Sequence, residues 1–498
     1  MSDPSSPRRL NQAILESLPA QVAVPRYDRS AVGQAIVHIG LGGFHRAHQA
    51  LYLDELLGRD GPGPWGVCGV GLLPQDKAME EALQPQDLLY TLVERDEGVE
   101  NARVIGTVRG YLHAPSEAGM VLSRMADPET RIVSLTVTEG GYYQDEGTRE
   151  LQQDHPNLRH DLERRDEPPV SVYGYLAEAL DRRRQAGTAP FTVLSCDNVQ
   201  SNGEVARRML TAFAGLRDAE LGRWIEENVA FPNCMVDRIT PATTDVHRDE
   251  VREILGGVAD AWPVVAEPFR QWVVEDRFCN GRPALETVGV QMTDDVHPYE
   301  LMKIRLLNAS HQALCHIGVL LGYRTSDVAM RDEQIRTLCE RYMDTVRPLI
   351  HEPPGIDLVD YQRTLIHRFG NPAVKDQLAR IAYDASSRIP GFVLPSAREQ
   401  LAKGGSIDLF ALVVAAWIRY LGGKDEAGTP IEVKDPLKDT LLSKVRFGDP
   451  DPTPFLGLRE VFGSDLVSNE TFASAVRAAL ESLYQKGCRD TLSTYLGA

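Results

Sequence analysis

The chain has 498 residues, of which 43% are hydrophobic and 25% charged, a composition typical of a globular enzyme and a length that predicts two domains. The formal net charge of -18 argues against a nucleic-acid partner, because phosphate binding needs clustered Lys and Arg. The 7 cysteines form no CxxC pair and are odd in number, which argues against a disulfide framework or a Cys-rich metal site and favours a reducing compartment.

Neither a secretory signal nor a membrane span is predicted. Residues 1–10 are polar and no apolar stretch follows them, and the longest apolar run, residues 409–418, is too short to cross a bilayer. We therefore expect a cytoplasmic protein with no membrane partner.

The first half of the chain alternates short apolar runs with helical patterns. The predicted strands are residues 35–39, 65–70, 89–94, 103–108, 131–138 and 191–196. The predicted helices are residues 46–57, 75–83, 170–186 and 203–213. Strands separated by helices predict a parallel, doubly wound sheet of the Rossmann type, and several of the runs are apolar nearly throughout, as in buried central strands.

The pattern changes near residue 290, beyond which long helical periods replace the strands. Predicted helices cover residues 297–321, 328–349, 358–368, 373–387, 408–420 and 470–486. The sequence therefore predicts an α/β protein with a Rossmann-type domain over residues 1–290 and a mainly α-helical domain over residues 291–498.

The first predicted strand runs through a glycine turn, Gly40-Leu41-Gly42, into a helix, an arrangement whose backbone amides can hold a pyrophosphate. The dinucleotide fingerprint has a third glycine where this chain has His45, so a turn that binds nothing is the alternative. Asp76, after the second strand, is the candidate partner of an adenosine ribose and favours NAD over NADP. Its alternative role is a first-turn Asp stabilised by the helix dipole.

A polar group stands out on the first helix of the second half. At about 100° per residue, Glu300, Lys303, Asn308 and His311 fall within about 140° of one another, on one face. Apolar neighbours indicate that this helix packs into protein, and partial desolvation would lower the pKa of Lys303 from about 10.4. The alternative is a surface helix on which Lys and His keep their charged ends in water.

Several segments together resemble the polyol-specific long-chain dehydrogenase/reductase family. They are residues 36–50, 65–71, 136–142, 195–198 and 236–241 and the helix of Lys303. In that family a Gly-x-Gly-x-Phe-His-Arg turn stands in place of the third glycine, so His45 fits the resemblance.

The resemblance implies roles for the polar residues. Lys303 corresponds to the family's catalytic lysine, the general acid and base. Asn198 and Asn308 match two amides that bind the reacting oxygen, His311 matches a histidine that orients the substrate, and Glu300 matches a carboxylate that gates proton passage to solvent.

The resemblance also implies which residues bind the NAD cofactor. They are Ile39, Gly40, Leu41, Gly42, Phe44, His45, Arg46, Asp76 and Glu139. Glu139 would lie at the nicotinamide, although a tight turn at Gly140-Gly141 is an equal alternative.

Substrate contacts are implied for Asp237, Arg380 and Arg388, the last of which is a Lys in some members of the family. Asp376, Arg380, Asp384 and Arg388 also form an i, i+4 series that is typical of a solvated ion-pair face. No HExxH motif occurs, and His45 and His48 have no Cys, Asp or His set beside them, so no metal site is expected.

The sequence thus predicts a zinc-independent, NAD-dependent polyol dehydrogenase, with its active site in the cleft between the domains. The expected reaction interconverts D-mannitol and D-fructose by hydride transfer at C2. Oxidation of D-arabinitol at C4, reduction of fructuronate and a non-catalytic sensor of NAD and sugar are the alternatives. The resemblance implies a monomer whose partner is a small polyol or ketose.

Overall fold

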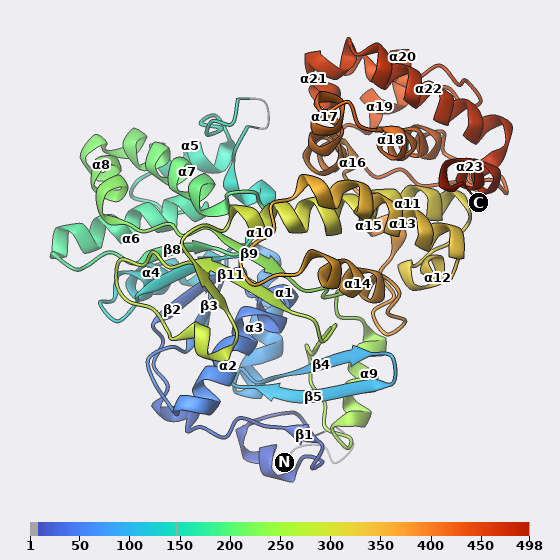
Figure 1. Cartoon of the computed structure of the whole chain (residues 1–498). Helices are drawn as coiled ribbons and strands as arrows, with labels where there is room; N and C mark the ends of the chain where they lie inside the picture. The colour runs from blue at the N-terminus through green and yellow to red at the C-terminus, as the bar shows by residue number, and fades with distance from the viewer. Residues whose placement is uncertain (1–7, 146–147, 498) are drawn as a thin grey trace. The chain divides into compact units, whose positions relative to one another are not determined.

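The computed structural model describes residues 8–145 and 148–497. The chain divides into two compact units, Met1–Val296 and His297–Ala498 (Figure 1). Across the described ranges, no helix combines the length and the apolar character that a bilayer crossing needs.

A five-stranded parallel sheet forms the centre of the first unit. Its strand order is β6 (Val108–His113), β3 (Val67–Gly71), β2 (Ile36–Ile39), β7 (Ile132–Leu135) and β8 (Thr192–Ser195). This is the order of a Rossmann sheet: successive strands are added on one side of β2 up to β6, and then on its other side from β7 onward. Ligands of such sheets bind at the carboxyl ends of the two strands that flank this switch.

Alternate strand residues build a core on each face of this sheet. Val37 and Ile39 point to one face and Ile36 to the other. The first face is covered by α4 (Ala114–Ala126), α5 (Pro156–Glu163), α6 (Val172–Ala186), α7 (Asn202–Arg217) and α8 (Ala219–Asn228). The second face is covered by α2 (Gln49–Asp60) and by strands of two smaller sheets, so the predicted doubly wound architecture is confirmed.

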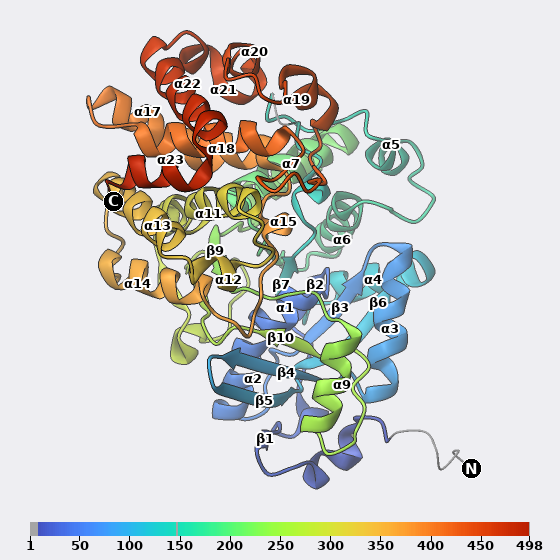
Figure 2. The ribbon, with the colours of Figure 1, turned by 90° about the vertical axis from the view of Figure 1, so that its right-hand side faces the viewer.

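Two smaller sheets complete the first unit. One has the order β1 (Val22–Ala23), β5 (Val99–Ile105), β4 (Tyr90–Asp96), β10 (Val264–Ala266), and the other has the order β12 (Gln291–Thr293), β11 (Gln271–Glu275), β9 (Cys234–Asp237). The remaining helices are α1 (Gly43–Ala47), α3 (Lys77–Leu83) and α9 (Asp245–Ile254). Strands β4 and β5 form an antiparallel hairpin, and α9 packs beside it (Figures 1 and 2).

Two strand predictions need correction. The strand expected at residues 89–94 exists, but it belongs to the hairpin sheet and not to the parallel sheet. The strand expected at residues 103–108 is wrong, because the chain leaves β5 at Ile105 and enters β6 at Val108. The Gly106 amide between them donates to the Asp54 carboxylate over 2.8 Å, which fixes the turn.

The second unit is helical. Its helices are α10 (His297–Met302), the π-helical turn η7 (Lys303–Asn308), α11 (Ala309–Leu320), α12 (Ser326–Met330), α13 (Glu333–Val346), α14 (Leu358–Phe369), α15 (Leu378–Ile381), α16 (Ala385–Arg388), the π-helical turn η9 (Ile389–Val393), α17 (Leu394–Ala402), α18 (Asp408–Leu421), α19 (Lys438–Lys444), α20 (Thr453–Leu456), α21 (Arg459–Val467), α22 (Glu470–Gln485) and α23 (Gly487–Leu496). Helix α18, buried over nearly its whole length, packs beside α22 (Figures 1 and 2).

The prediction of one continuous helix over residues 373–387 is wrong. Two short helices, α15 and α16, replace it, and Asp384 between them has a φ of 58°. This left-handed conformation interrupts a helix, and Asp is among the few residues with a side chain that tolerate it. The i, i+4 series of Asp and Arg therefore does not lie on one helix face.

Candidate active site

The turn after β2 has the geometry that a bound dinucleotide requires. Gly40 has a φ of 94°, and a Cβ atom at this position would lie 2.0 Å from the Thr136 carbonyl oxygen. The Gly42 amide donates back to the Gly40 carbonyl over 2.6 Å, which closes a tight turn at the strand end where the strand order switches sides. Only glycine fits at position 40, and in Rossmann sheets a glycine turn at this edge is where main-chain amides approach a dinucleotide.

His38, on strand β2, contacts this turn through hydrogen bonds. Its Nε2 lies 3.2 Å from the Gly40 carbonyl and 2.9 Å from Thr136 Oγ1, and its Nδ1 lies 2.8 Å from Ser134 Oγ. Burial lowers the pKa of His38 to about 3, so the ring is neutral. Because a carbonyl can only accept, Nε2 carries the proton and Nδ1 accepts from Ser134.

His45 fills the place of the missing third glycine. Its ring stacks on His38 with centroids 3.4 Å apart, and α1 breaks from α2 at His48, where the backbone is not helical. The buried Arg46 side chain donates to the Trp262 carbonyl over 2.5 Å. Four side chains of the predicted cofactor set are buried: Ile39, Leu41, His45 and Arg46.

Asp76 lies where an adenosine ribose partner is expected, after the end of β3. Its Oδ2 accepts from the Leu73 amide over 2.9 Å, and its carbonyl accepts from the Tyr111 hydroxyl over 2.9 Å. Gly71 permits this approach, since a Cβ atom there would lie 2.5 Å from Asp76 Cβ. The carboxylate is therefore fixed at the strand end, and it caps its own short helical turn as well.

Glu139 and Asn198 lie at the same edge of the parallel sheet. Glu139 follows β7 and Asn198 follows the neighbouring strand β8, and both are exposed. The buried Asp197 carboxylate accepts from the Val137 amide over 3.0 Å and from the Thr138 amide over 2.9 Å, so it joins the two strand ends. Asp237, the substrate-side candidate of this unit, ends β9 and is buried.

Lys303 and Asn308 begin and end the π-helical turn η7, where the sequence predicted a regular α-helix. The Ala309 amide donates to the Ile304 carbonyl, an i to i+5 bond. In a π-helical turn, residues i and i+5 lie about one turn apart, so their side chains point in similar directions. In an α-helix the directions of Lys303 and Asn308 would differ by about 140°. The turn therefore brings Lys303 and Asn308 to one side of the helix.

Polar groups on and beside this turn are buried. Lys303 and Glu300 are both buried, at 8% and 6% exposed. Within the described residues the buried Asn308 Oδ1 has no hydrogen-bond partner. A buried polar atom without a partner is costly, and a 180° rotation of the amide presents its NH2 group at the same point. The Asn308 amide is thus available to a ligand oxygen or hydroxyl.

His311 lies one turn beyond and is held by a residue that the sequence analysis missed. Its ring packs on Phe369 at the end of α14, with centroids 4.3 Å apart and planes at 31°. Phe369 is fully buried and fixes the plane of the imidazole. No sequence signal links the two, because they belong to different helices.

The two arginines expected at the substrate differ in their surroundings. Arg380 pairs through Nε with the Asp376 carboxylate over 2.7 Å, and its side chain is 61% exposed. Arg388 donates to the Ile381 carbonyl over 2.9 Å and directly precedes η9. The two π-helical turns η7 and η9 contact each other, so within this unit Arg388 belongs to the same neighbourhood as the turn of Lys303.

The site residues thus form two groups. One lies at the carboxyl edge of the parallel sheet and the other on the α10–η7–α11 helix and η9. In the part of the chain that the structure describes, no three His, Cys, Asp or Glu side chains cluster as metal ligands would. A Rossmann sheet with a glycine turn after β2, followed by a helical unit with a buried lysine, is an arrangement suited to a nucleotide-dependent dehydrogenase.

Comparison with known proteins assigns the family. The Rossmann domain model of mannitol dehydrogenases matches residues 34–287, and the C-terminal domain model of mannitol dehydrogenases matches residues 295–484. The chain belongs to the mannitol dehydrogenase family. The sequence resemblance to polyol-specific long-chain dehydrogenases, and among them to mannitol 2-dehydrogenase, is confirmed.

Relatives match the chain over nearly its whole length. A mannitol 2-dehydrogenase of Aspergillus fumigatus is 45% identical over 99% of this chain and 100% of its own. The structure of Pseudomonas fluorescens mannitol 2-dehydrogenase in a ternary complex with NAD and D-mannitol is 44% identical and matches 98% of this chain and 99% of its own, with a TM-score of 0.90. A substrate-free D-sorbitol dehydrogenase is 38% identical, covers 97% and 100%, and has a TM-score of 0.89.

Proposed function

We propose that this protein oxidises D-mannitol to D-fructose with NAD, reversibly, by hydride transfer at C2 and without zinc. The similarity to the ternary complex with NAD and D-mannitol supports the cofactor and the substrate. The observation that carries the chemistry is the buried Lys303 on a π-helical turn that ends at an unpartnered Asn308 amide.

The glycine turn and the strand ends suit NAD. Main-chain amides at Gly40 to Phe44 would hold the pyrophosphate, and the fixed Asp76 carboxylate would accept hydrogen bonds from the adenosine ribose. The same carboxylate disfavours the 2′-phosphate of NADP through charge repulsion. Glu139, exposed after β7, would lie near the nicotinamide, whose ring supplies the hydride acceptor when bound.

In this proposal the protein's residues handle the proton and the oxygen. Lys303 takes the hydroxyl proton as the C2 hydride leaves, and Glu300 passes that proton on toward solvent. The amides of Asn198 and Asn308 donate to the oxygen as it becomes alkoxide-like, and His311, held by Phe369, orients the hydroxyl. A lysine and two amides then do the work that a zinc ion does in other alcohol dehydrogenases.

Asp237, Arg380 and Arg388 are the proposed contacts to the other hydroxyl groups. Arg388 already donates to a backbone carbonyl, so its planar guanidinium is oriented before substrate arrives. The Asp376 partner of Arg380 likewise fixes the direction of that side chain. These fixed positions would set which polyol fits.

A substrate panel tests the assignment. The purified protein is assayed at the nicotinamide absorbance with D-mannitol, D-sorbitol, D-arabinitol, D-fructose and fructuronate, each with NAD(H) and NADP(H), with and without a chelator. We expect D-mannitol and D-fructose with NAD(H) to give the highest kcat/KM, unchanged by the chelator. The D-sorbitol dehydrogenase relative makes D-sorbitol the second candidate. Reduction of fructuronate without oxidation of any polyol would overturn the proposal.

A further inference from the structure

Asp197 is a buried carboxylate that the proposed chemistry does not use. It is 8% exposed and directly precedes Asn198. Its Oδ1 accepts from the Thr138 amide over 2.9 Å, and its Oδ2 accepts from the Val137 amide over 3.0 Å. Thr138 in turn directly precedes Glu139. Asp197 therefore precedes one proposed site residue, Asn198, and its carboxylate binds the residue that precedes another, Glu139.

The loop that Asp197 holds has a strained backbone. Thr138 has a φ of 62° and a ψ of 169°, a region that essentially only glycine populates. The Thr138 carbonyl accepts from the Gly141 amide over 3.0 Å, and a Cβ atom at Gly141 would lie 2.7 Å from a Val137 methyl group. Such a conformation persists only where surrounding bonds impose it. Asp197 supplies two of these bonds, one at the Thr138 amide and one at the Val137 amide before it.

A tyrosine gives the loop a second attachment to the same strand. The Tyr142 hydroxyl lies 2.8 Å from Asp197 Oδ2 and 2.5 Å from Ser195 Oγ, and the Tyr142 ring is buried. Burial raises the pKa of Asp197 to about 6 against the opposing effect of its hydrogen-bond donors. The carboxyl is thus mainly ionised at neutral pH, the state in which it accepts all three bonds.

We propose that Asp197 is a positioning residue, which fixes Glu139 and Asn198 relative to each other so that the cofactor end and the reacting oxygen keep one geometry. This inference rests on the proposed function. It differs from a role in folding alone, because it requires the strained loop geometry for hydride transfer and not only for stability.

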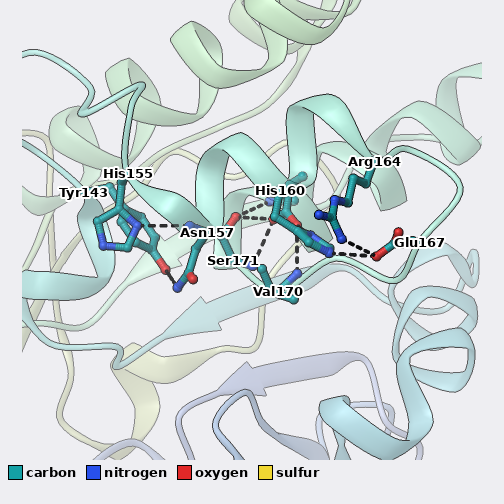
Figure 3. A network of polar contacts seen from close by, with 10 residues as sticks. Tyr143, His155, Asn157, His160, Arg164, Glu167, Val170 and Ser171 are labelled. Atoms are coloured by element: carbon teal, nitrogen blue, oxygen red, sulfur yellow. Dashed lines mark hydrogen bonds and ion pairs between the residues drawn. The ribbon is translucent and has the colours of Figure 1, made fainter.

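The chain offers a matched control in Asp161. This carboxylate is also buried and also accepts from two consecutive amides, Val170 over 2.9 Å and Ser171 over 2.9 Å, and from the Ser171 hydroxyl over 2.6 Å. Figure 3 shows Val170 and Ser171 in this network with His160. None of its partners belongs to the proposed site, so Asp161→Asn removes the same kind of clamp elsewhere in the unit.

The test compares Asp197→Asn with Asp161→Asn in the full chain. Asparagine keeps one acceptor oxygen and directs an NH2 group at a backbone amide, so each variant loses at least one clamp bond. We expect both to lower the melting temperature, but only Asp197→Asn to lower kcat for polyol oxidation, by tenfold or more. We also expect a larger primary deuterium isotope effect with 2-deuterated mannitol in that variant alone.

Equal kcat per folded molecule in the two variants, with equal isotope effects, would overturn the inference. If Asp197→Asn does not fold, Tyr142→Phe decides, since it removes only the hydroxyl attachment: a raised isotope effect supports the inference and an unchanged one overturns it. A wild-type protein inactive on every polyol refutes the proposed function instead. Amide exchange at residues 137–142, faster in Asp197→Asn than in Asp161→Asn, then still reports whether the clamp sets the loop geometry.

Discussion

Lys303 is the residue on which the proposed chemistry most depends. We expect Lys303→Ala to lower kcat by roughly 10²–10⁴-fold, because a positioned general base contributes about that much. The protein should remain folded, since alanine suits a helical turn. The measurement is steady-state polyol oxidation together with a melting curve.

Lys486 provides the control for this variant, as it lies exposed at the end of α22 in the same unit. Lys486→Ala should keep normal turnover. Near-normal turnover of Lys303→Ala would contradict the mechanism.

His160 lies between two carboxylates, which should make its contribution to stability depend on pH. Its Nδ1 lies 3.0 Å from Asp161 and its Nε2 lies 3.2 Å from Glu167 (Figure 3), and these hydrogen bonds raise its pKa above the usual 6.5. A raised folded-state pKa adds stability that is complete below the unfolded pKa and is lost as pH rises through the folded one. His160→Ala should therefore lower the melting temperature more at about pH 5.5 than at about pH 9.

His247 should affect stability with the opposite pH dependence. Partial burial lowers its pKa below the usual value, so its contribution is present above the unfolded pKa and is lost as pH falls. His247→Ala should cost more stability at the higher pH. The same trend in both variants would mean that neither histidine governs the pH dependence.

Single residues could be predicted where their signal is local, and were missed where it is not. Gly40 lies in a short motif, so the sequence indicates its turn directly, whereas the role of Lys303 comes from the family resemblance and stays a prediction. Asp197 binds amides about 60 positions away in the chain, and Phe369 packs on a ring of another helix. Their contacts depend on which elements become neighbours, and no spacing in one sequence records that.

At the scale of elements, apolar runs in the sequence identified most of the strands, but they did not show which sheet each strand joins. The predicted strands at β2, β3, β7 and β8 form the parallel sheet, as expected. The run at β4 looks the same in sequence, yet it pairs antiparallel with β5, because a short turn at Gly98 joins them directly. The π-helical turns also escaped prediction, since the same apolar pattern fits an α-helix.

Arg305, a residue of the turn η7, anchors this turn to two other segments of the second unit. Arg305 donates to the Leu349 carbonyl over 2.6 Å and to the Glu399 carboxylate over 2.8 Å. Charge-assisted bonds of this kind contribute about 1.5–3 kcal/mol each. Arg305→Met should therefore lower the melting temperature by several degrees and lower kcat, because the turn that presents Lys303 and Asn308 loosens.

Lys403 is the matched control, as it pairs with the same Glu399 over 2.9 Å from an exposed position. Lys403→Met should leave kcat unchanged. Affinity for NAD should be normal in both variants, because the glycine turn belongs to the other unit. A kcat that is unchanged in Arg305→Met would show that η7 does not need this attachment.

For the whole molecule, the proposed site divides between two units that play different parts. The glycine turn, Asp76, Glu139 and Asn198 belong to the first unit, and Lys303, Asn308 and His311 to the second. If the first binds NAD and the second supplies the proton chemistry, the two ligands should protect different segments from amide exchange, since a ligand stabilises what it contacts.

We expect NAD alone to slow exchange at residues 40–45 and 138–141 and to leave residues 303–311 unaffected. NADH with D-mannitol, a pair that cannot react, should in addition slow exchange at 303–311, because the polyol would bridge the nicotinamide and the lysine. Mass spectrometry of peptic fragments measures both, and D-mannitol alone is the control. Protection of 303–311 by NAD alone would mean that the cofactor itself orders the second unit, and the proposed division of labour would then be wrong.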